Sequence, residues 1–174
     1  MVDTAPTINR HMFRAYDIRG LAGTDLTPEV TRLIGQAWGT RLRRRGGSSM
    51  VVGGDLRPHT PELKAGFIEG ATASGCDVTD IGDATSPLMY FATIHRKTDG
   101  GVNITASHNP VEYNGIKMVE REALPISEEE IGNVRDLAIG RDFEHGNGAV
   151  STWDPTPAYY DKVEALTSIA RPMS

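Results

Sequence analysis

The sequence predicts an α/β layer structure built on a largely parallel sheet. Short runs of branched apolar residues, bounded by glycine, alternate with segments whose apolar residues recur at helical spacing. Strands that alternate with helices in this way are typical of a parallel sheet covered by helices. The length of 174 residues and the hydrophobic content of 39% fit one well-packed domain.

Five short runs are predicted to be strands. The first opens the chain around Phe13 to Ile18, and the others are branched runs bounded by glycine or turn residues. These later runs comprise residues 50–53, 77–81, 101–105 and 116–119.

Four helices are each predicted to begin at a Ser/Thr-Pro pair. The hydroxyl side chain caps the helix, and proline fits the first helical position because its missing N–H would have no partner there. A fifth helix is predicted to begin at the capping box formed by Ser127 and Glu130. The four pairs are Thr27-Pro28, Thr60-Pro61, Ser86-Pro87 and Thr156-Pro157.

The polar, glycine-containing stretch 141–155 is predicted to be an irregular exit from the domain. The helix from Thr156 to about Ile169 would then be an appendage or a connector, so we place the domain in residues 1–154 and the connector in 155–174. Tyr159 and Leu166 are among the side chains of this helix that would need partners at an interdomain surface.

Composition excludes several classes of function. Eighteen Lys and Arg against 23 Asp and Glu leave a net charge of −5, so the chain is not built to bind nucleic acid through bulk charge. The single cysteine, Cys76, can form neither an internal disulfide nor a cysteine-built zinc site. The N-terminus lacks the apolar stretch of a secretion signal, and no run approaches the ~18 apolar residues of a membrane helix. We therefore expect a cytoplasmic protein without membrane or nucleic-acid partners.

The polar loops at the predicted strand ends form a candidate site. In an open α/β sheet, ligands bind beyond the carboxyl ends of the strands. Residues 53–57, residues 105–110 and the turn 17–20 end predicted strands, and residues 114–118 follow closely. Together they supply a serine, an imidazole, a lysine and guanidinium groups. Because arginine and lysine match phosphate oxygens, the sequence predicts an anionic substrate, most simply a phosphate ester.

Ser107 has two interpretations from the residues alone. It is either a nucleophile or, with Thr105 and Asn109, a turn residue before Pro110. A Ser-His-Asp hydrolase is disfavoured, because the Gly-x-Ser-x-Gly elbow is absent and a base adjacent in sequence usually points elsewhere.

Four motifs, in order, resemble the α-D-phosphohexomutase superfamily. Residues 105–110 (TASHNP) are similar to its phosphoserine loop, and residues 13–20 (FRAYDIRG) to the N-terminal signature of its phosphomannomutase/phosphoglucomutase branch. Residues 52–58 (VGGDLRP) are similar to Val-Gly-Arg-Asp-x-Arg, although Gly54 replaces the arginine, and residues 114–117 (NGIK) to Asn-Gly-x-Lys. The resemblance covers nearly the whole chain, but only about the first third of such an enzyme.

The resemblance implies a fold and a reaction. The fold is a three-layer α/β/α domain with a mixed, mostly parallel four-stranded sheet, followed by a connector helix towards a second domain that the sequence lacks. The enzyme is an intramolecular phosphotransferase of the isomerase class, which interconverts hexose 1-phosphate and 6-phosphate of mannose or glucose through a 1,6-bisphosphate.

The resemblance also implies roles for individual residues. Ser107 would carry the phosphoryl group, His108 would shape the charge around it, and Lys117 would be a general acid or base. Arg57 has a second interpretation, a structural salt bridge near the loop. The residues implied in binding substrate or phosphate are Tyr16, Arg19, Arg57 and Asn109.

The implied metal is Mg²⁺, held by a phosphoserine oxygen at Ser107 and by three aspartates of an Asp-Gly-Asp-x-Asp-Arg loop in the second domain. No such loop occurs in this chain. Asp77, Asp80 and Asp83 do not replace it, since residues spaced by three on a strand alternate between its faces. With hexose 1,6-bisphosphate as activator, the chain alone is expected to be inactive and to require the remaining domains of the enzyme.

Two alternatives remain open. One is the same domain of a phosphoglucosamine or phosphoacetylglucosamine mutase, although the FRAYDIRG opening differs from the usual signature of the first. The other is a non-catalytic phosphate-binding or docking module, which the absent metal loop favours. Mutase activity restored by adding a separately made remainder of the enzyme would favour an enzyme domain.

Overall fold

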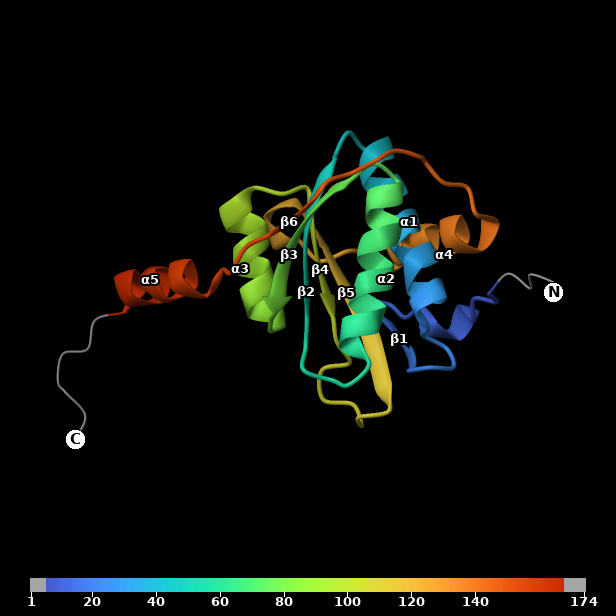
Figure 1. Ribbon diagram of the computed structural model, residues 1–174, viewed down its shortest axis with the longest axis horizontal. Coiled ribbons are helices and arrows are strands. Elements are labelled where there is room, and N and C mark those ends of the chain that lie inside the picture. Colours follow the sequence, from blue (N-terminus) through green and yellow to red (C-terminus); the bar gives the residue numbers. More distant parts are fainter. Residues whose placement is uncertain (1–5, 168–174) are drawn as a thin grey trace.

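A six-stranded sheet runs through the centre of the computed structural model, which describes residues 6–167 (Figure 1). Strand β5 is antiparallel to both β1 and β4, whereas β4, β2, β3 and β6 are mutually parallel. In spatial order the strands are β1 (Ile18–Leu21), β5 (Tyr113–Glu120), β4 (Gly100–Ile104), β2 (Ser49–Gly54), β3 (Asp77–Asp83) and β6 (Val150–Thr152). The mixed, mostly parallel sheet is confirmed, and the prediction of four strands is wrong.

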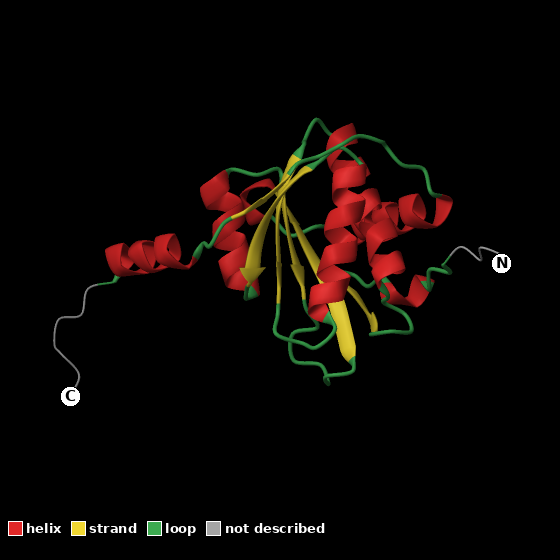
Figure 2. Cartoon of the chain, viewed as in Figure 1, coloured by secondary structure: helices red, strands yellow, loops and turns green. Residues whose placement is uncertain are grey.

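Helices cover both faces of the sheet, which confirms the three-layer α/β/α architecture (Figure 2). One face carries α1 (Pro28–Arg44), α2 (Thr60–Ala73) and α4 (Glu128–Gly140). The other carries α3 (Ser86–Arg96), with α5 (Thr156–Leu166) projecting beside it. Two short 3₁₀ helices, η1 (Arg10–Met12) and η2 (Arg121–Ala123), complete the described elements.

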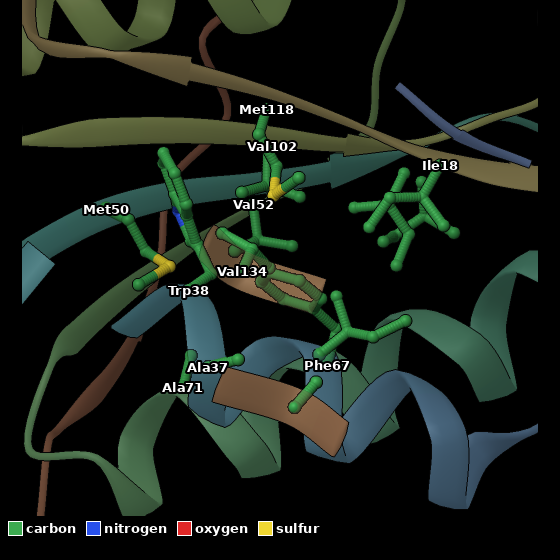
Figure 3. Close-up of a cluster of buried hydrophobic side chains, with 14 of the residues drawn as sticks. Ile18, Ala37, Trp38, Met50, Val52, Phe67, Ala71, Val102, Met118 and Val134 are labelled. Carbon is green, nitrogen blue, oxygen red and sulfur yellow. The ribbon is translucent and has the colours of Figure 1, made fainter. Parts of the chain in front are cut away.

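The main core lies between the sheet and the helices α1, α2 and α4 (Figure 3). Val52, Val102 and Met118 lie in register on three neighbouring strands. Trp38 of α1 and Phe67 of α2 belong to the same cluster, and all five side chains are at most 1% exposed. Burial of one such side chain contributes about 1.5–3 kcal/mol to folding, so this row fixes how β2, β4 and β5 align at the site.

Two glycines let α1 and α2 pack backbone against backbone. A Cβ atom on Gly70 would lie 1.8 Å from the carbonyl oxygen of Arg32, and one on Gly35 would lie 2.2 Å from that of Phe67. Real Cβ atoms do not approach backbone so closely, so both positions require glycine.

The helix starts differ from the prediction by one residue in three cases. Thr27 caps α1 as predicted, since its Oγ1 accepts a hydrogen bond from the Val30 N–H at 3.3 Å. By contrast Thr60, Ser86 and Thr156 are the first helical residues, and the N-cap positions are His59, Thr85 and Pro155. The residue before proline also fits the first turn, so a Ser/Thr-Pro pair does not by itself decide which residue is the cap.

Half of the predicted capping box of α4 forms. Ser127 Oγ accepts from the Glu130 N–H at 3.3 Å. The Glu130 carboxylate, however, binds the guanidinium groups of Arg41 and Arg45 instead of returning to the cap. This ion pair joins α4 to α1, and the Arg41 side chain is buried. The helical periodicity of the sequence did not indicate the contact.

Residues 141–155 are not an irregular exit, as the sequence suggested. Val150–Thr152 form the edge strand β6, paired in parallel with β3. All three side chains are exposed, so the strand is held by its backbone and leaves no hydrophobic pattern in the sequence. Gly148 allows the approach, because a Cβ there would lie 1.8 Å from the carbonyl oxygen of Cys76.

The first and last predicted elements are also corrected. The opening strand is Ile18–Leu21 rather than Phe13 to Ile18, because Phe13 makes only an isolated bridge to Ile18. Helix α5 ends at Leu166, and the predicted end at Ile169 lies outside the described residues. The Tyr159 ring packs edge-on against Phe91 of α3 at 5.3 Å, while Leu166 is exposed. The domain boundary at residue 154 stays a prediction. Within residues 6–167 no helix has the length and apolar character needed to cross a membrane.

The glycine contact predicts a large effect of one methyl group. Gly70→Ala should lower the free energy of unfolding by about 1–3 kcal/mol, because the methyl group must push α2 away from α1. Gly132→Ala in α4 is the matched control, since the nearest atom to its Cβ would be Arg135 Nη2 at 3.8 Å. This variant should be neutral or more stable by up to about 1 kcal/mol. Urea unfolding measures both, and equal stabilities would contradict the close contact.

Candidate active site

The carboxyl ends of β2, β3 and β4 meet at one edge of the sheet, because these strands are parallel. The loops 55–59 and 105–112 lie together below the sheet in Figure 1. The Asp55 N–H donates to the carbonyl oxygen of Ile104 at 3.0 Å and so joins the start of one loop to the end of β4. Strand β5 begins at the same edge and places the 114–117 motif beside the serine loop.

Ser107 adopts an uncommon backbone conformation. Its φ angle is +57°, in the left-handed region that disfavours side chains other than glycine. Its hydroxyl oxygen lies 3.3 Å from His108 Nδ1, and both residues are exposed. A left-handed residue needs support from its surroundings, since this conformation costs about 1–3 kcal/mol.

The two peptide groups that flank Ser107 receive this support from three side chains. The Ser107 N–H donates to Thr105 Oγ1 at 2.9 Å. Arg19 Nη1 donates to the carbonyl oxygen of Ala106 at 3.0 Å. On the other side, Arg57 Nη2 donates to the carbonyl oxygen of Ser107 at 3.0 Å. The backbone around the exposed hydroxyl is therefore fixed from several segments.

All five side-chain N–H donors of Arg57 hydrogen-bond to protein atoms. A guanidinium has five N–H donors, and here Nε donates to Asp55 Oδ2 at 3.1 Å while Nη1 and Nη2 donate to four backbone carbonyls. This geometry matches the structural interpretation of Arg57 and offers no unused N–H for a phosphate. The carbonyls belong to Pro110 (2.6 Å), Tyr113 (3.0 Å), Ser107 (3.0 Å) and Asn109 (2.6 Å).

Arg19 is the guanidinium that retains donors. It hydrogen-bonds Asp17 through Nε at 2.8 Å and Ala106 through Nη1, and its side chain is 22% exposed. Two bonds leave N–H groups for an anion. Asn109, by contrast, accepts a hydrogen bond from Arg57 Nη2 through its carbonyl oxygen and donates its backbone N–H to the carbonyl oxygen of Ala106.

Lys117 lies on the same face of the sheet as Arg19. Ile18 and Ile116 point into the core beneath α1 and α2, so Arg19 and Lys117, each one residue further along, face the α3 side. Lys117 is the cross-strand partner of Asn103. Tyr16, in the turn before β1, is 69% exposed, and the described contacts do not bring it to the serine loop.

A surface cavity of about 600 Å³ lies between the serine loop and the N-terminus of α3. Asn103 lines it and is 1% exposed, and among the described residues its Oδ1 has no hydrogen-bond partner. Sequence reasoning missed Asn103, for which a polar residue inside an apolar strand was the only signal. The remaining walls include Asp55, Thr85, Ser86, Thr105, Ser107 and His108.

The described residues do not form a metal site by themselves. Within 6–167 no group of three or more His, Cys, Asp or Glu side chains is placed to hold an ion. Asp80 instead accepts a hydrogen bond from Lys64 Nζ at 2.8 Å. Cys76 is fully buried, and burial raises the pKa of its thiol, as expected for a packing residue rather than a nucleophile.

The sequence of this chain is similar to that of phosphoglucomutases and phosphomannomutases. The family model "Phosphoglucomutase/phosphomannomutase, alpha/beta/alpha domain I" matches residues 10–145. A phosphomannomutase/phosphoglucomutase of Pseudomonas aeruginosa is 37% identical over 97% of this chain, and a phosphomannomutase of Salmonella montevideo is 42% identical over 92%. The chain spans 36% of the length of each of these relatives.

A solved structure has the same fold. The crystal structure of a phosphoglucomutase/phosphomannomutase family protein from Burkholderia thailandensis superposes with a TM-score of 0.91 at 34% sequence identity. The match covers 96% of this chain and 38% of that one.

The hydrogen bonds of Arg57 predict a structural effect of a conservative change. Arg57→Lys keeps the charge but replaces a five-donor fork with three donors on one atom. The free energy of unfolding should fall by about 2 kcal/mol or more, since hydrogen bonds to charged groups contribute about 1.5–3 kcal/mol each. Arg43→Ala, at the exposed end of α1, should stay within about 0.5 kcal/mol. If urea unfolding gave Arg57→Lys the stability of the unsubstituted chain, the structural interpretation would be wrong.

Proposed function

The chain belongs to the phosphoglucomutase/phosphomannomutase family, and we propose that it is the phosphoserine-bearing domain of an enzyme that interconverts hexose 1-phosphate and hexose 6-phosphate of glucose or mannose. The geometry of Ser107 is the observation that carries this proposal. Its hydroxyl is exposed at a cavity, while both flanking peptide groups are held by side chains. A turn residue with no other role would not require support from its own loop and from two distant segments of the chain.

The proposed reaction has two matched transfers. In the first, the bond between phosphorus and Ser107 Oγ breaks as a bond forms from phosphorus to the unsubstituted hydroxyl of a hexose phosphate. That hydroxyl gives up its proton, and Ser107 Oγ regains one. In the second, the other phosphate of the resulting 1,6-bisphosphate passes back to Ser107. The result is an isomerisation of the sugar phosphate with Ser107 phosphorylated again.

The neighbouring residues have separate proposed roles. Lys117 moves the hydroxyl proton, since an amine is a suitable general acid or base. Arg19 retains donors and so binds phosphoryl oxygens, for which a guanidinium is well shaped. His108 lies close enough to hydrogen-bond Ser107 Oγ and tunes the charge there. Tyr16 and Asn109 remain proposed contacts of the substrate.

Magnesium and a hexose 1,6-bisphosphate belong to the proposal as cofactors. Phosphoryl oxygens on Ser107 are ligands of the kind that Mg²⁺ prefers, and the ion would neutralise charge on the transferred group. Residues 6–167 offer no cluster of side chains that would complete the coordination of the ion. The other ligands would come from further domains, as the greater length of the relatives suggests.

The 174-residue chain alone is predicted to lack mutase turnover with Mg²⁺ and glucose 1,6-bisphosphate present. Charge stabilisation on the transferred phosphoryl group carries much of such a reaction, and this chain provides only part of it. A coupled assay of glucose 6-phosphate formation measures the rate. Robust turnover by the chain alone would contradict the proposal that further domains supply part of the charge stabilisation.

In a protein that joins this chain to the remaining domains of the Pseudomonas aeruginosa relative, Ser107→Ala should abolish turnover because the phosphoryl acceptor is gone. Lys117→Ala should slow it by about 10²–10⁴-fold, the usual effect of losing a proton-transfer group. Initial rates with glucose 1-phosphate measure both effects. Arg43→Ala is the control and should have the turnover rate of the unsubstituted protein. Near-normal rates for Ser107→Ala at unchanged stability would make a phosphate-binding module the better interpretation.

A further inference from the structure

Asp55 accepts hydrogen bonds from Thr105 and Arg57, two of the side chains that hold the backbone at Ser107. A carboxylate has about four lone-pair sites, and four donors occupy those of Asp55. Oδ1 accepts from the Arg57 N–H at 3.1 Å and from Thr60 Oγ1 at 2.7 Å. Oδ2 accepts from Arg57 Nε at 3.1 Å and from Thr105 Oγ1 at 2.7 Å.

The charge of Asp55 decides the direction of the neighbouring hydrogen bonds. An ionised carboxylate only accepts, so the single hydroxyl protons of Thr105 and Thr60 must both point at it. Thr105 Oγ1 is then left as the acceptor for the Ser107 N–H at 2.9 Å. In the same way, Thr60 Oγ1 is left as the acceptor for Asn114 Nδ2, also at 2.9 Å.

Through these hydrogen bonds Asp55 influences the backbone on both sides of the Ser107 Cα. Thr105, oriented by Asp55, takes the N–H that precedes the Ser107 Cα. Arg57, paired with Asp55, donates to the carbonyl that follows it. The residue between these two points is the one with φ +57°. Holding both ends of a left-handed residue opposes its relaxation to ordinary backbone.

We infer that Asp55 is a positioning residue: through Thr105 and Arg57 it holds Ser107 in the left-handed conformation that presents the hydroxyl at the cavity. The conformational part of this inference stands on the contacts alone. Its consequence for catalysis rests on the proposed function of Ser107. Thr105 transmits the effect of Asp55 to Ser107, so Thr105 can be substituted while the partly buried carboxylate stays in place.

The conformational part is tested by NMR on the 174-residue chain. Thr105→Val is nearly isosteric but lacks the hydroxyl, so the Ser107 amide should exchange with solvent about tenfold faster or more. The positive φ of Ser107, read from its three-bond amide coupling, should also be lost. Thr105→Ser keeps the hydroxyl and should restore both signals. The Val52 amide in β2 reports whether the sheet is intact.

A second pair of variants separates local positioning from general stability. Asp55→Asn places a donor where only acceptors fit and should change the Ser107 signals as Thr105→Val does. Thr60→Val cuts the branch from Asp55 to Asn114 but not the one to Ser107. It should lower the melting temperature while the Ser107 signals stay. Unchanged exchange and coupling at Ser107 in Thr105→Val would overturn the inference.

The catalytic part uses the protein joined to the remaining domains. Thr105→Val should lower kcat by about 10²-fold with little change in KM, because displacing the reacting group by about an ångström costs this much. Thr105→Ser should recover most of the rate. A Thr105→Val kcat equal to that of the unsubstituted protein would overturn this part. Ser107→Ala in the same protein tests the proposed function separately, so the two failures are distinguishable.

Discussion

An ionised carboxylate can only accept hydrogen bonds, and this property of Asp55 orders the carboxyl edge of the sheet. Its four donors come from the loop after β2, the first residue of α2 and the loop after β4. Because the acceptor sites of Asp55 are all occupied and the directions of these hydrogen bonds are fixed, the three segments are held in one arrangement. A partly buried polar network of this kind stabilises a single geometry only when every member is satisfied.

The network depends in turn on the strands that bring its members together. The row of Val52, Val102 and Met118 aligns β2, β4 and β5 in the core, and the loops leave these strands a few residues later. Gly54, at the end of β2, lets α2 approach, since a Cβ there would lie 2.5 Å from Thr60 Cγ2. Gly54 thus admits the Thr60 side chain to the network.

The arginines near Ser107 divide into two kinds. Arg57 gives all of its donors to Asp55 and to backbone carbonyls, so it shapes the loop. Arg19 makes two bonds and keeps donors that face the α3 side of the sheet, as Lys117 does. An arginine in such a loop can therefore serve the backbone alone, because holding several carbonyl groups in place uses the same fork of donors that could bind an anion.

Local patterns in the sequence predicted the layer architecture, the central parallel strands, the caps at Thr27 and Ser127, and the loop that contains Ser107. These features follow from local patterns, since periodicity, capping side chains and short motifs act over a few residues. No local pattern indicated that Val150–Thr152 pair with β3, that Glu130 binds Arg41, or that Asp55 joins Thr60 to Thr105, and these contacts are visible in the folded chain. Most of these contacts link residues far apart in the chain or use backbone groups alone, so which acceptor a donor meets depends on how the strands align.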